Sequence, residues 1–337
     1  MSSVAVVILN FNGRDFLEKF LPFVIQYSSP HEVIVADNAS TDDSLPFLQV
    51  NYPQLRVIKM TTNKGYAGGY NEALAQIKAD YYVLLNSDIE VTENWIDPVV
   101  QLMEANEQSF AAQPKLRSYY KKDHFEYAGA AGGFMDYLGY PFCRGRIFST
   151  AEKDNGQYND NREVFWATGA CLFVKARLYH ELGGLDENFF AHMEEIDLCW
   201  RAKNKGYSIH YCGESLVYHV GGGTLNSESP YKTFLNFRNN LLMLHKNLNS
   251  AEASAILKKR KGLDLIASMQ LFLSGKAKNA RAIYDAYKAF KQLKGQYTDQ
   301  PATSGLMHKE IYTRSIVQEY FMKGKKHFSA LSKQQFK

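Results

Sequence analysis

The first hundred residues alternate short apolar runs with amphipathic stretches, and no other feature constrains the fold of this chain as strongly. Phe16–Tyr27 places apolar residues on one face at helical spacing, and NKGYAGGYNEAL, residues 63–74, opens a second helix-like segment. Strands that alternate with helices at this spacing predict a parallel sheet with right-handed crossovers. The four apolar runs that we expect to form its strands are Val4–Leu9, Val33–Ala36, Leu55–Lys59 and Tyr81–Leu85.

The pattern changes twice further along the chain. Residues 115–160 carry scattered Gly and Tyr, and we expect them to be irregular or to form short antiparallel strands. After about residue 225 helical periodicity dominates, so we predict a domain of residues 1–225 and a mainly helical region of residues 226–337. The elements predicted in between are a strand at Ala170–Val174, a short helix that ends at Gly183 and Gly184, a helix over residues 189–207, and closing strands at Ser208–Tyr211 and Ser215–Tyr218.

Charge divides the chain at the same place. Residues 1–225 carry 19 Lys and Arg against 28 Asp and Glu, a net charge of −9, whereas residues 226–337 carry 20 against 7, a net charge of +13. A basic region behind an acidic body predicts an anionic partner, either a nucleic acid or a membrane surface. The start of the chain lacks a signal-peptide pattern, and no window reaches the roughly 18 apolar residues of a membrane span. The four cysteines lack disulfide or zinc spacing, which favours reduced thiols in the cytosol.

Polar residues follow the predicted strands, and parallel strands end at one shared edge of a sheet. Asn10 follows the first strand, and Asp37 and Asn38 follow the second. An acid after the second strand can accept hydrogen bonds from a base or a ribose, as in dinucleotide-binding folds. The alternative is that ADNASTDDS only begins a helix. We favour a ligand role for Asp37, and a helix-start role for Asp42 and Asp43.

Two further segments meet this predicted edge. Gly65, Gly68 and Gly69 lie at the start of a helix and permit close approach of a ligand, although their spacing is neither GxGxxG nor a Walker loop. The fourth strand runs into Asn-Ser-Asp at residues 86–88. Asp88 can hold a divalent cation whose other ligands are substrate phosphates. A polar turn is the alternative interpretation of the same three residues.

A second acidic cluster lies in HMEEIDLCWR. Glu194 and Glu195 are adjacent, and Glu194 and Asp197 share one side of the predicted helix. An acid close to another acid in a sheltered site has a raised pKa, which suits a general base near neutral pH. Taken alone, a solvated helix start is the better-supported interpretation. Taken alone, His219 in YHVGGGT is better interpreted as a core histidine than as a metal ligand.

Taken together and in order, these segments resemble the inverting glycosyltransferases of family 2. The resemblance covers roughly residues 1–245 and is closest to the branch that includes rhamnosyltransferases of cell-surface polysaccharide assembly. It implies the GT-A fold, a Rossmann-like α/β fold with a mostly parallel sheet, here with a C-terminal helical extension. The matching pieces are VILNFN, ADNASTDDS, NKGYAGGYN, LLNSD, GACLFVKARLYHELGGLDENFF, EEIDLCWR and VYHVGGGT.

The resemblance also assigns roles. It implies a DXD-type motif that grips the nucleotide diphosphate through Mn²⁺ or Mg²⁺, with Asn86 in place of the first acid and Asp88 as the metal ligand. It makes His219 a further metal ligand, which reverses the interpretation from that residue alone. Glu195 matches the catalytic base, with Glu194 as the alternative. The implied nucleotide-sugar site comprises Asn10, Asp37, Asn38, Asn63, Gly65, Asn86, Ser87 and Asp88, and the implied acceptor side comprises Trp166, Thr168, Gly169 and Asp197.

Some of these implications have alternatives. Trp166 can stack on a sugar or simply fill the core, and Arg238 and Asn239 are hypothesised to contact phosphate. Lys258–Lys261 lie beside the apolar run Leu263–Leu273, which either rests on an anionic membrane or packs as a helical subdomain. We expect a cytoplasmic protein, and the membrane interpretation further places it peripherally on the inner face of the plasma membrane.

The implied reaction is one in-line displacement with inversion. A sugar leaves a dTDP- or UDP-sugar, dTDP-rhamnose among the candidates, for a hydroxyl of a saccharide or of a polyprenyl-diphosphate-linked acceptor, in cell-surface polysaccharide biosynthesis. The rival enzyme is a nucleotidyltransferase, for which NFNGRD is a poor phosphate loop. A non-catalytic nucleotide-sugar-binding module is the rival from another class. A nucleic-acid binder fits the acidic body badly.

Overall fold

The computed structural model describes residues 2–221, 229–298, 301 and 304–337. Its strands are β1 (Val4–Asn10), β2 (Glu32–Asp37), β3 (Arg56–Lys59), β4 (Tyr81–Asn86), β5 (Ile89–Val91), β6 (Ser109–Ser118), β7 (Gly133–Asp136), β8 (Pro141–Cys143), β9 (Arg146–Ile147), β10 (Thr150–Ala151), β11 (Arg162–Val164), β12 (Cys171–Lys175), β13 (Ser208–His219) and β14 (Ile311–Tyr312). Its helices are α1 (Arg14–Ser28), α2 (Ser44–Asn51), α3 (Gly65–Leu74), α4 (Asp97–Glu104), α5 (Ala176–Glu181), α6 (Glu194–Asn204), α7 (Pro230–Asn247), α8 (Ser250–Leu273), α9 (Ala277–Leu293) and α10 (Ile316–Phe321), with 3₁₀ turns η1 (Glu187–Phe189), η2 (Lys294–Gln296), η3 (Phe328–Ala330) and η4 (Lys333–Gln335).

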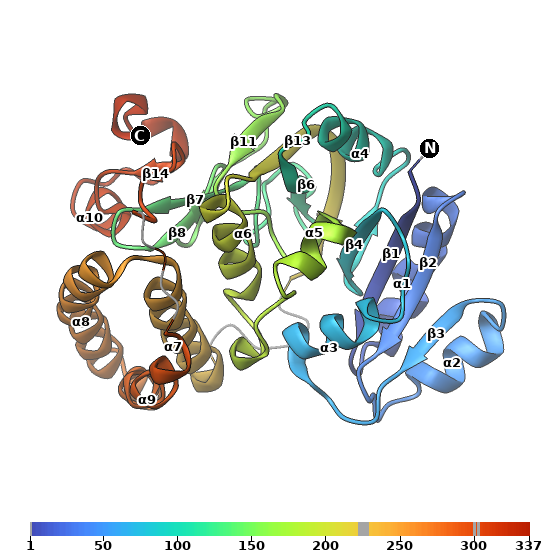
Figure 1. Cartoon of the computed structure of the whole chain (residues 1–337), viewed down its shortest axis with the longest axis horizontal. Helices are drawn as coiled ribbons and strands as arrows, with labels where there is room; N and C mark the ends of the chain where they lie inside the picture. Colours follow the sequence, from blue (N-terminus) through green and yellow to red (C-terminus); the bar gives the residue numbers. More distant parts are fainter. Residues whose placement is uncertain (1, 222–228, 299–300, 302–303) are drawn as a thin grey trace.

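A nine-stranded sheet forms the centre of the described structure (Figure 1). Its strands follow the order β11-β13-β6-β12-β4-β1-β2-β3, and β5 adds to it by pairing with β13. Strands β1 to β4 are parallel, and β12 inserts between β4 and β6 in the antiparallel direction. The α/β fold predicted from the alternating pattern is confirmed, and the ends of β1, β2 and β4 meet at one edge.

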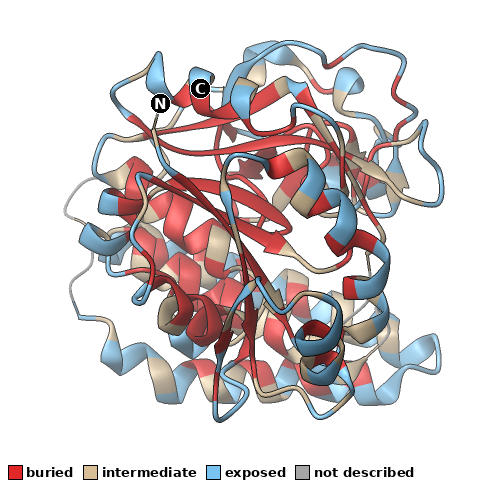
Figure 2. Cartoon of the chain, turned by 90° about the vertical axis from the view of Figure 1, so that its right-hand side faces the viewer, coloured by how far each residue is buried: buried red, intermediate tan, exposed pale blue. Residues whose placement is uncertain are grey.

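Side chains of β1 explain why the central strands are apolar throughout. Val6 belongs to an apolar cluster that includes Leu17 of α1, while its neighbour Val7 belongs to a second cluster that includes Tyr70 of α3. Successive residues of a strand point to opposite faces, and helices cover both faces here. The central strands are accordingly buried along their length (Figure 2).

The structure corrects three predicted elements. Strand β6 lies in the middle of the sheet but was not predicted, because Gln113, Pro114 and Lys115 interrupt its apolar pattern. The two predicted closing strands are one strand, β13, with a shift in register between Cys212 and Leu216. The helix predicted over residues 189–207 begins only at Glu194.

The C-terminal helices are followed by a return to the body of the protein. Strand β14 pairs with β7 in a second sheet of order β10-β9-β8-β7-β14, and the Trp200 indole N–H donates to the Gly305 carbonyl at 3.1 Å. The predicted division between residues 225 and 226 lies outside the described residues. None of the helices in the described ranges has the length and hydropathy needed to cross a membrane. All four cysteines are buried and free.

Candidate functional site

Asp37 organises the edge where β1 and β2 end. Asn10 lies opposite Asp37 in the sheet register and donates from Nδ2 to Asp37 Oδ2 at 3.1 Å, while the Ser40 backbone N–H donates to Oδ1 at 3.0 Å. Asp37 is fully buried, like Asn10, and its carboxylate shapes the loop; its predicted contact with base or ribose stays a prediction. Asn10 Oδ1 is buried with no hydrogen-bond partner among the described residues.

Asn38, Asn63 and Gly65 form the adjoining part of this edge. Asn38 Nδ2 donates to Asn63 Oδ1 at 3.1 Å and to the Gly65 carbonyl at 2.9 Å. Gly65 has φ +68°, and a Cβ at this position would lie 2.5 Å from the Phe190 carbonyl oxygen. Only glycine fits this close approach with a left-handed backbone. The turn around Phe190 is therefore packed directly against the predicted nucleotide edge.

The strand β4 ends beside His219. Asn86 and Ser87 are partly exposed, whereas Asp88 is buried and its Oδ1 lies 3.2 Å from His219 Nε2. On the other side of the ring, Nδ1 lies 3.2 Å from Glu126 Oε2. Sequence reasoning missed Glu126, because it lies in an irregular segment without a motif.

Electrostatics link these three groups. Burial lowers the pKa of His219, but the carboxylates of Glu126 and Asp88 outweigh burial and raise it to about 10. Burial alone would raise the pKa of Asp88, but the charge of His219 outweighs burial, so the pKa of Asp88 is lowered. An imidazolium thus lies between two carboxylates, and it would have to lose a proton before a ring nitrogen bound a cation.

Asp88 and His219 have the donor types that a divalent cation uses. Carboxylate and imidazole suit Mn²⁺, and Mg²⁺ is commonly held by one or two carboxylates together with substrate phosphates. His219 Nδ1 lies at ion-pair distance from Glu126 but has no well-aligned hydrogen bond among residues 2–221, 229–298, 301 and 304–337. Within those ranges no three His, Cys, Asp or Glu side chains form a complete metal site. The pair fits a cation that also binds the substrate, rather than a closed protein cage.

Glu194 and Glu195 begin α6 directly after a strained turn. Phe190, His192 and Met193 all have positive φ, at 63°, 71° and 74°. Non-glycine residues rarely adopt this conformation, and it persists only where the surroundings enforce it. The turn explains why α6 starts later than periodicity predicts.

Both glutamates are sheltered, which contradicts a solvated helix start. Burial raises the pKa of each, and the pKa of Glu194 is raised further by the charges of Glu195 and Asp197. Glu195 is the more exposed of the two, so its carboxylate is the one that an incoming hydroxyl can reach. Each has an Oε2 atom with no hydrogen-bond partner in the described part of the chain. This favours Glu195 as a proton acceptor.

His192 lies in the same turn and was not singled out from the sequence. Burial, together with the positive charge of Lys232, lowers its pKa to about 4, so the ring is neutral at pH 7. Its Nε2 is buried and has no described hydrogen-bond partner. His192 thus adds a neutral polar group next to the acid pair.

The predicted acceptor side is mainly internal. Trp166 is buried, donates to the Phe134 carbonyl at 2.9 Å and packs against Gly133, so it fills the core instead of offering a face to a sugar. Thr168 is buried as well, and its Oγ1 accepts from the backbone of Ala170. The predictions of direct acceptor contacts by Trp166 and Thr168 are thus not supported by their geometry.

Gly169 is closer to the acid pair. Its carbonyl accepts from the Tyr66 hydroxyl at 2.5 Å, and a Cβ at Gly169 would lie 3.6 Å from Cβ of Glu195. The backbone N–H of Gly169 also partly offsets the rise in the pKa of Glu195. Gly169 and Tyr66 therefore border the candidate base.

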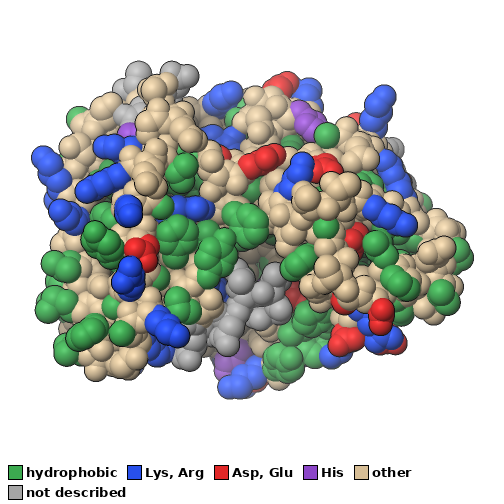
Figure 3. Space-filling view, turned by 90° about the horizontal axis from the view of Figure 1, so that it is seen from below, with side chains coloured by type: hydrophobic (Ala, Val, Ile, Leu, Met, Phe, Trp, Pro, Cys, Tyr) green, Lys and Arg blue, Asp and Glu red, His purple; other side chains and the backbone are tan. Residues whose placement is uncertain are grey.

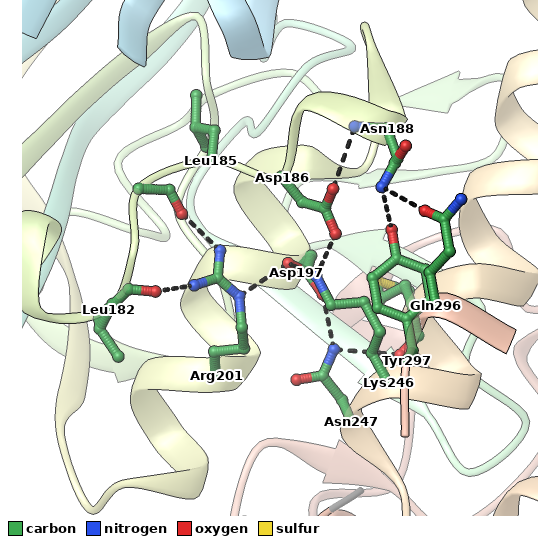
Figure 4. Close-up of polar contacts among 12 residues, drawn as sticks. Leu182, Leu185, Asp186, Asn188, Asp197, Arg201, Lys246, Asn247, Gln296 and Tyr297 are labelled. Atoms are coloured by element: carbon green, nitrogen blue, oxygen red, sulfur yellow. Dashed lines mark hydrogen bonds and ion pairs between the residues drawn. The ribbon is translucent and has the colours of Figure 1, made fainter. Parts of the chain in front are cut away.

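Asp197 is a structural anchor in this arrangement (Figure 4). Its Oδ2 lies 2.8 Å from Arg201 Nε and 2.9 Å from Lys246 Nζ, and its Oδ1 accepts from Asn247 Nδ2 at 2.8 Å. The side chain is fully buried, so the predicted contact with an acceptor is not available. These contacts join α6 to α7.

Asn239 of α7 holds the turn that precedes the acid pair. Its Nδ2 lies 2.9 Å from the carbonyl oxygens of Phe189 and Ala191 and 2.7 Å from that of His192. Arg238 donates to the Phe189 carbonyl at 3.1 Å and to Asn239 Oδ1 at 2.8 Å. Both residues therefore contact the protein backbone, in place of the phosphate contact hypothesised from the sequence.

Replacing Asn239 with alanine is expected to loosen this turn. The carbonyls of Phe189, Ala191 and His192 share the two N–H hydrogens of this amide, and losing them costs about 1–3 kcal/mol in the free energy of unfolding. Hydrogen–deuterium exchange over residues 188–195 is expected to rise, and turnover to fall with nucleotide affinity unchanged. The control is Asn236→Ala, a partly exposed position on the same helix. Equal exchange over residues 188–195 in the two variants would contradict the role of Asn239 in holding this turn.

The comparisons with known proteins agree on one family. The sequence model described as glycosyl transferase family 2 matches residues 5–183. The N-acetylglucosaminyl-diphospho-decaprenol L-rhamnosyltransferase of Mycobacterium tuberculosis is 27% identical over 230 residues, 64% of this chain and 75% of that protein. The rhamnosyltransferase WbbL of Escherichia coli is 25% identical over 217 residues, 62% of this chain and 80% of that protein.

A solved structure shares the fold at low sequence identity. The crystal structure of GalNAc-T7 with UDP, GalNAc and Mn²⁺ aligns with a TM-score of 0.59 at 12% identity. The alignment covers 88% of this chain and 58% of that chain. At this identity the likeness concerns the fold alone.

Proposed function

This chain belongs to glycosyl transferase family 2, with the GT-A fold, and from this premise we propose which substrates it joins and how. The donor is a UDP- or dTDP-sugar, dTDP-rhamnose among the candidates, because its relatives include rhamnosyltransferases. The acceptor is a hydroxyl of a saccharide or of a polyprenyl-diphosphate-linked sugar, since one relative is named for such a lipid. The reaction is a step in the biosynthesis of a glycan.

One observation carries the proposed mechanism. Glu195 has a raised pKa and a carboxylate oxygen without a described partner, and the turn before it packs against Gly65 of the nucleotide edge. Glu195 Oε2 takes the proton from the acceptor hydroxyl while the hydroxyl oxygen bonds to the anomeric carbon and the bond from that carbon to the nucleoside diphosphate breaks. No glycosyl–enzyme bond forms, so the single displacement inverts the anomeric configuration.

Asp88 and His219 are the residues that would hold Mn²⁺ or Mg²⁺. Such a cation supplies charge stabilisation of the departing diphosphate. The sheltered position of Asp88 and the paired donors Asp88 and His219 support this assignment. Asn10 and Asn86, at the ends of β1 and β4, complete the donor edge.

The pH dependence follows from the base. A base must be ionised to accept a proton, and burial raises the pKa of Glu195 above that of an exposed glutamate. Activity is therefore present above the raised pKa and is lost as the pH falls through it. The acid limb of kcat/KM, measured between about pH 4 and 8, is expected above the ordinary glutamate value of about 4.3. An acid limb at or below that value contradicts this role.

Calorimetry of nucleotide binding tests the donor site. UDP and dTDP are titrated with and without Mn²⁺ into the natural protein, Asp88→Ala and Glu90→Ala. We expect one nucleotide to bind in a metal-dependent way, and Asp88→Ala to weaken it by about tenfold or more, roughly 1.4 kcal/mol. Glu90, two residues further on and paired with Lys122, is the control and should bind as the natural protein does. Binding of neither nucleotide in any condition would sink the donor assignment.

A further inference from the structure

The second half of α8 leaves an apolar face uncovered. Five large side chains there are more than half exposed, and their spacing places them along one side of the helix. Three of them, Met269, Phe272 and Leu273, line an open groove of about 450 Å³ together with the start of α9, whose residues Ala277, Ala280 and Arg281 complete it with Ser268. The five residues, hereafter the α8 patch, are Leu265, Ile266, Met269, Phe272 and Leu273.

The surroundings of the α8 patch are positively charged. Residues 250–293 carry nine Lys and Arg against three Asp and Glu, a net charge of +6. Of those acids, Asp264 is buried and bonded to two tyrosines, and Asp285 lies 3.7 Å from Arg281. Lys258, Lys259 and Lys261 are exposed in the preceding turns. Hydrophobic side chains and Lys or Arg side chains intermingle on this side of the molecule (Figure 3).

An anionic lipid surface satisfies both properties of this face. Apolar side chains enter the boundary between headgroups and acyl chains, while lysines beside them contact the acidic headgroups. A second copy of the chain would bring the same lysines against each other, which opposes self-association through this face. Nucleic acid would pair with the lysines but leave Leu265, Ile266 and Leu273 in water.

The α8 patch is connected to the acid pair's turn through the starts of α9 and α7. Asn279, near the start of α9, donates to Thr233 Oγ1 in the first turn of α7 at 2.9 Å. In that same turn the ring of Tyr231 lies 6.5 Å from the ring of Phe190. The patch, the start of α7 and the turn before Glu195 are therefore consecutive neighbours.

We propose that the α8 patch docks the protein on an anionic lipid bilayer, with the start of α7 and the turn before Glu195 close to that surface. The inference rests on the proposed function in one respect, because a lipid-linked acceptor would then meet the base at the membrane face. Docking itself does not depend on which sugar is transferred.

Flotation with lipid vesicles tests the proposal on the full chain. The natural protein is expected to float with vesicles that contain phosphatidylglycerol, to release in high salt, and to bind pure phosphatidylcholine vesicles far less. The double variant Phe272→Ser, Leu273→Ser should lower binding by about a hundredfold, given the transfer free energy of two large apolar side chains. The triple variant Lys258→Gln, Lys259→Gln, Lys261→Gln should lose a similar factor and the preference for anionic lipid.

Controls separate docking from folding and from catalysis. Val50→Ser removes an equally exposed apolar residue on α2 and should float as the natural protein does. UDP and dTDP binding, measured in parallel, should be unchanged in every variant. If the natural protein floats with anionic vesicles but binds neither UDP nor dTDP, the proposed function is overturned and docking is not. Absence of flotation with nucleotide binding intact overturns docking alone, as does a dimer in light scattering that the Phe272→Ser, Leu273→Ser variant dissociates.

Discussion

Replacing Glu195 with glutamine is expected to lower turnover by about a thousandfold while nucleotide affinity stays within about twofold. General-base catalysis contributes roughly 10²–10⁴ in rate, and the amide has the shape of the acid but cannot take the proton. Glu195 is sheltered, has a raised pKa and has an oxygen without a described partner. The measurement is release of the nucleoside diphosphate from the donor sugar in the presence of acceptor.

Glu194→Gln is the matched control for this experiment. Because Glu194 is buried and Glu195 is the more exposed of the pair, an acceptor hydroxyl reaches Glu195, and turnover of Glu194→Gln should fall by less than about tenfold. If Glu194→Gln lowers turnover more than Glu195→Gln does, Glu194 is the base. A natural protein that binds nucleotide but turns over none of the UDP- and dTDP-sugars tested would support the binding-module interpretation instead.

Replacing Asp197 with alanine is expected to destabilise the fold by roughly 3–5 kcal/mol, the range for removing one partner of a buried ion pair. The variant leaves Arg201 and Lys246 without their shared carboxylate and Asn247 without its acceptor. Lys246 keeps a contact with Asp186 at 2.6 Å, which favours the lower end of that range. Denaturant unfolding measures the change.

The control and the pH dependence sharpen this prediction. Asp285→Ala breaks an exposed i,i+4 pair with Arg281 and should cost less than about 0.5 kcal/mol. Lys246 and Arg201 outweigh burial and lower the pKa of Asp197, so its contribution is present above the unfolded-state pKa and is lost as the pH falls through the folded-state value. The difference in the free energy of unfolding between the natural protein and Asp197→Ala should therefore become smaller in acid. A constant gap across the acid range would refute the ionic origin.

The sequence predicts β1 and β4 most clearly, because burial leaves no room for polar residues before these strands end, and it misses the three-residue β5. The sequence does not predict β6, because the polar residue Gln113 interrupts its apolar pattern. Gln113 can be buried since its side chain is hydrogen-bonded: Nε2 donates to the Gly129 carbonyl and Oε1 accepts from the Thr168 N–H. Such a partner, far along the chain, leaves no periodic signal. The late start of α6 has the same cause, because Phe190 and its neighbours are held by Gly65 and Asn239.

The candidate site was predictable in its residue types more than in its contacts. Strand order alone brings Asn10, Asp37 and Asn86 to one edge, and the resemblance to family 2 adds Glu195 and His219. The partner of His219, Glu126, carries no motif, and the burial of Trp166 depends on Gly133. Which polar group faces a ligand and which one braces the fold depends on tertiary contacts that spacing does not encode.

The hold of Asn239 on the turn before Glu195 has a consequence for how such proteins can be recombined. The placement of the acid pair is shared between a segment near residue 190 and a helix that begins forty residues later. A chimaera that grafts the C-terminal helices of a relative onto this body would inherit active geometry only if the graft supplies an amide at the position of Asn239 and a cation at that of Lys246. Exchange of the two parts is thereby restricted to matched pairs.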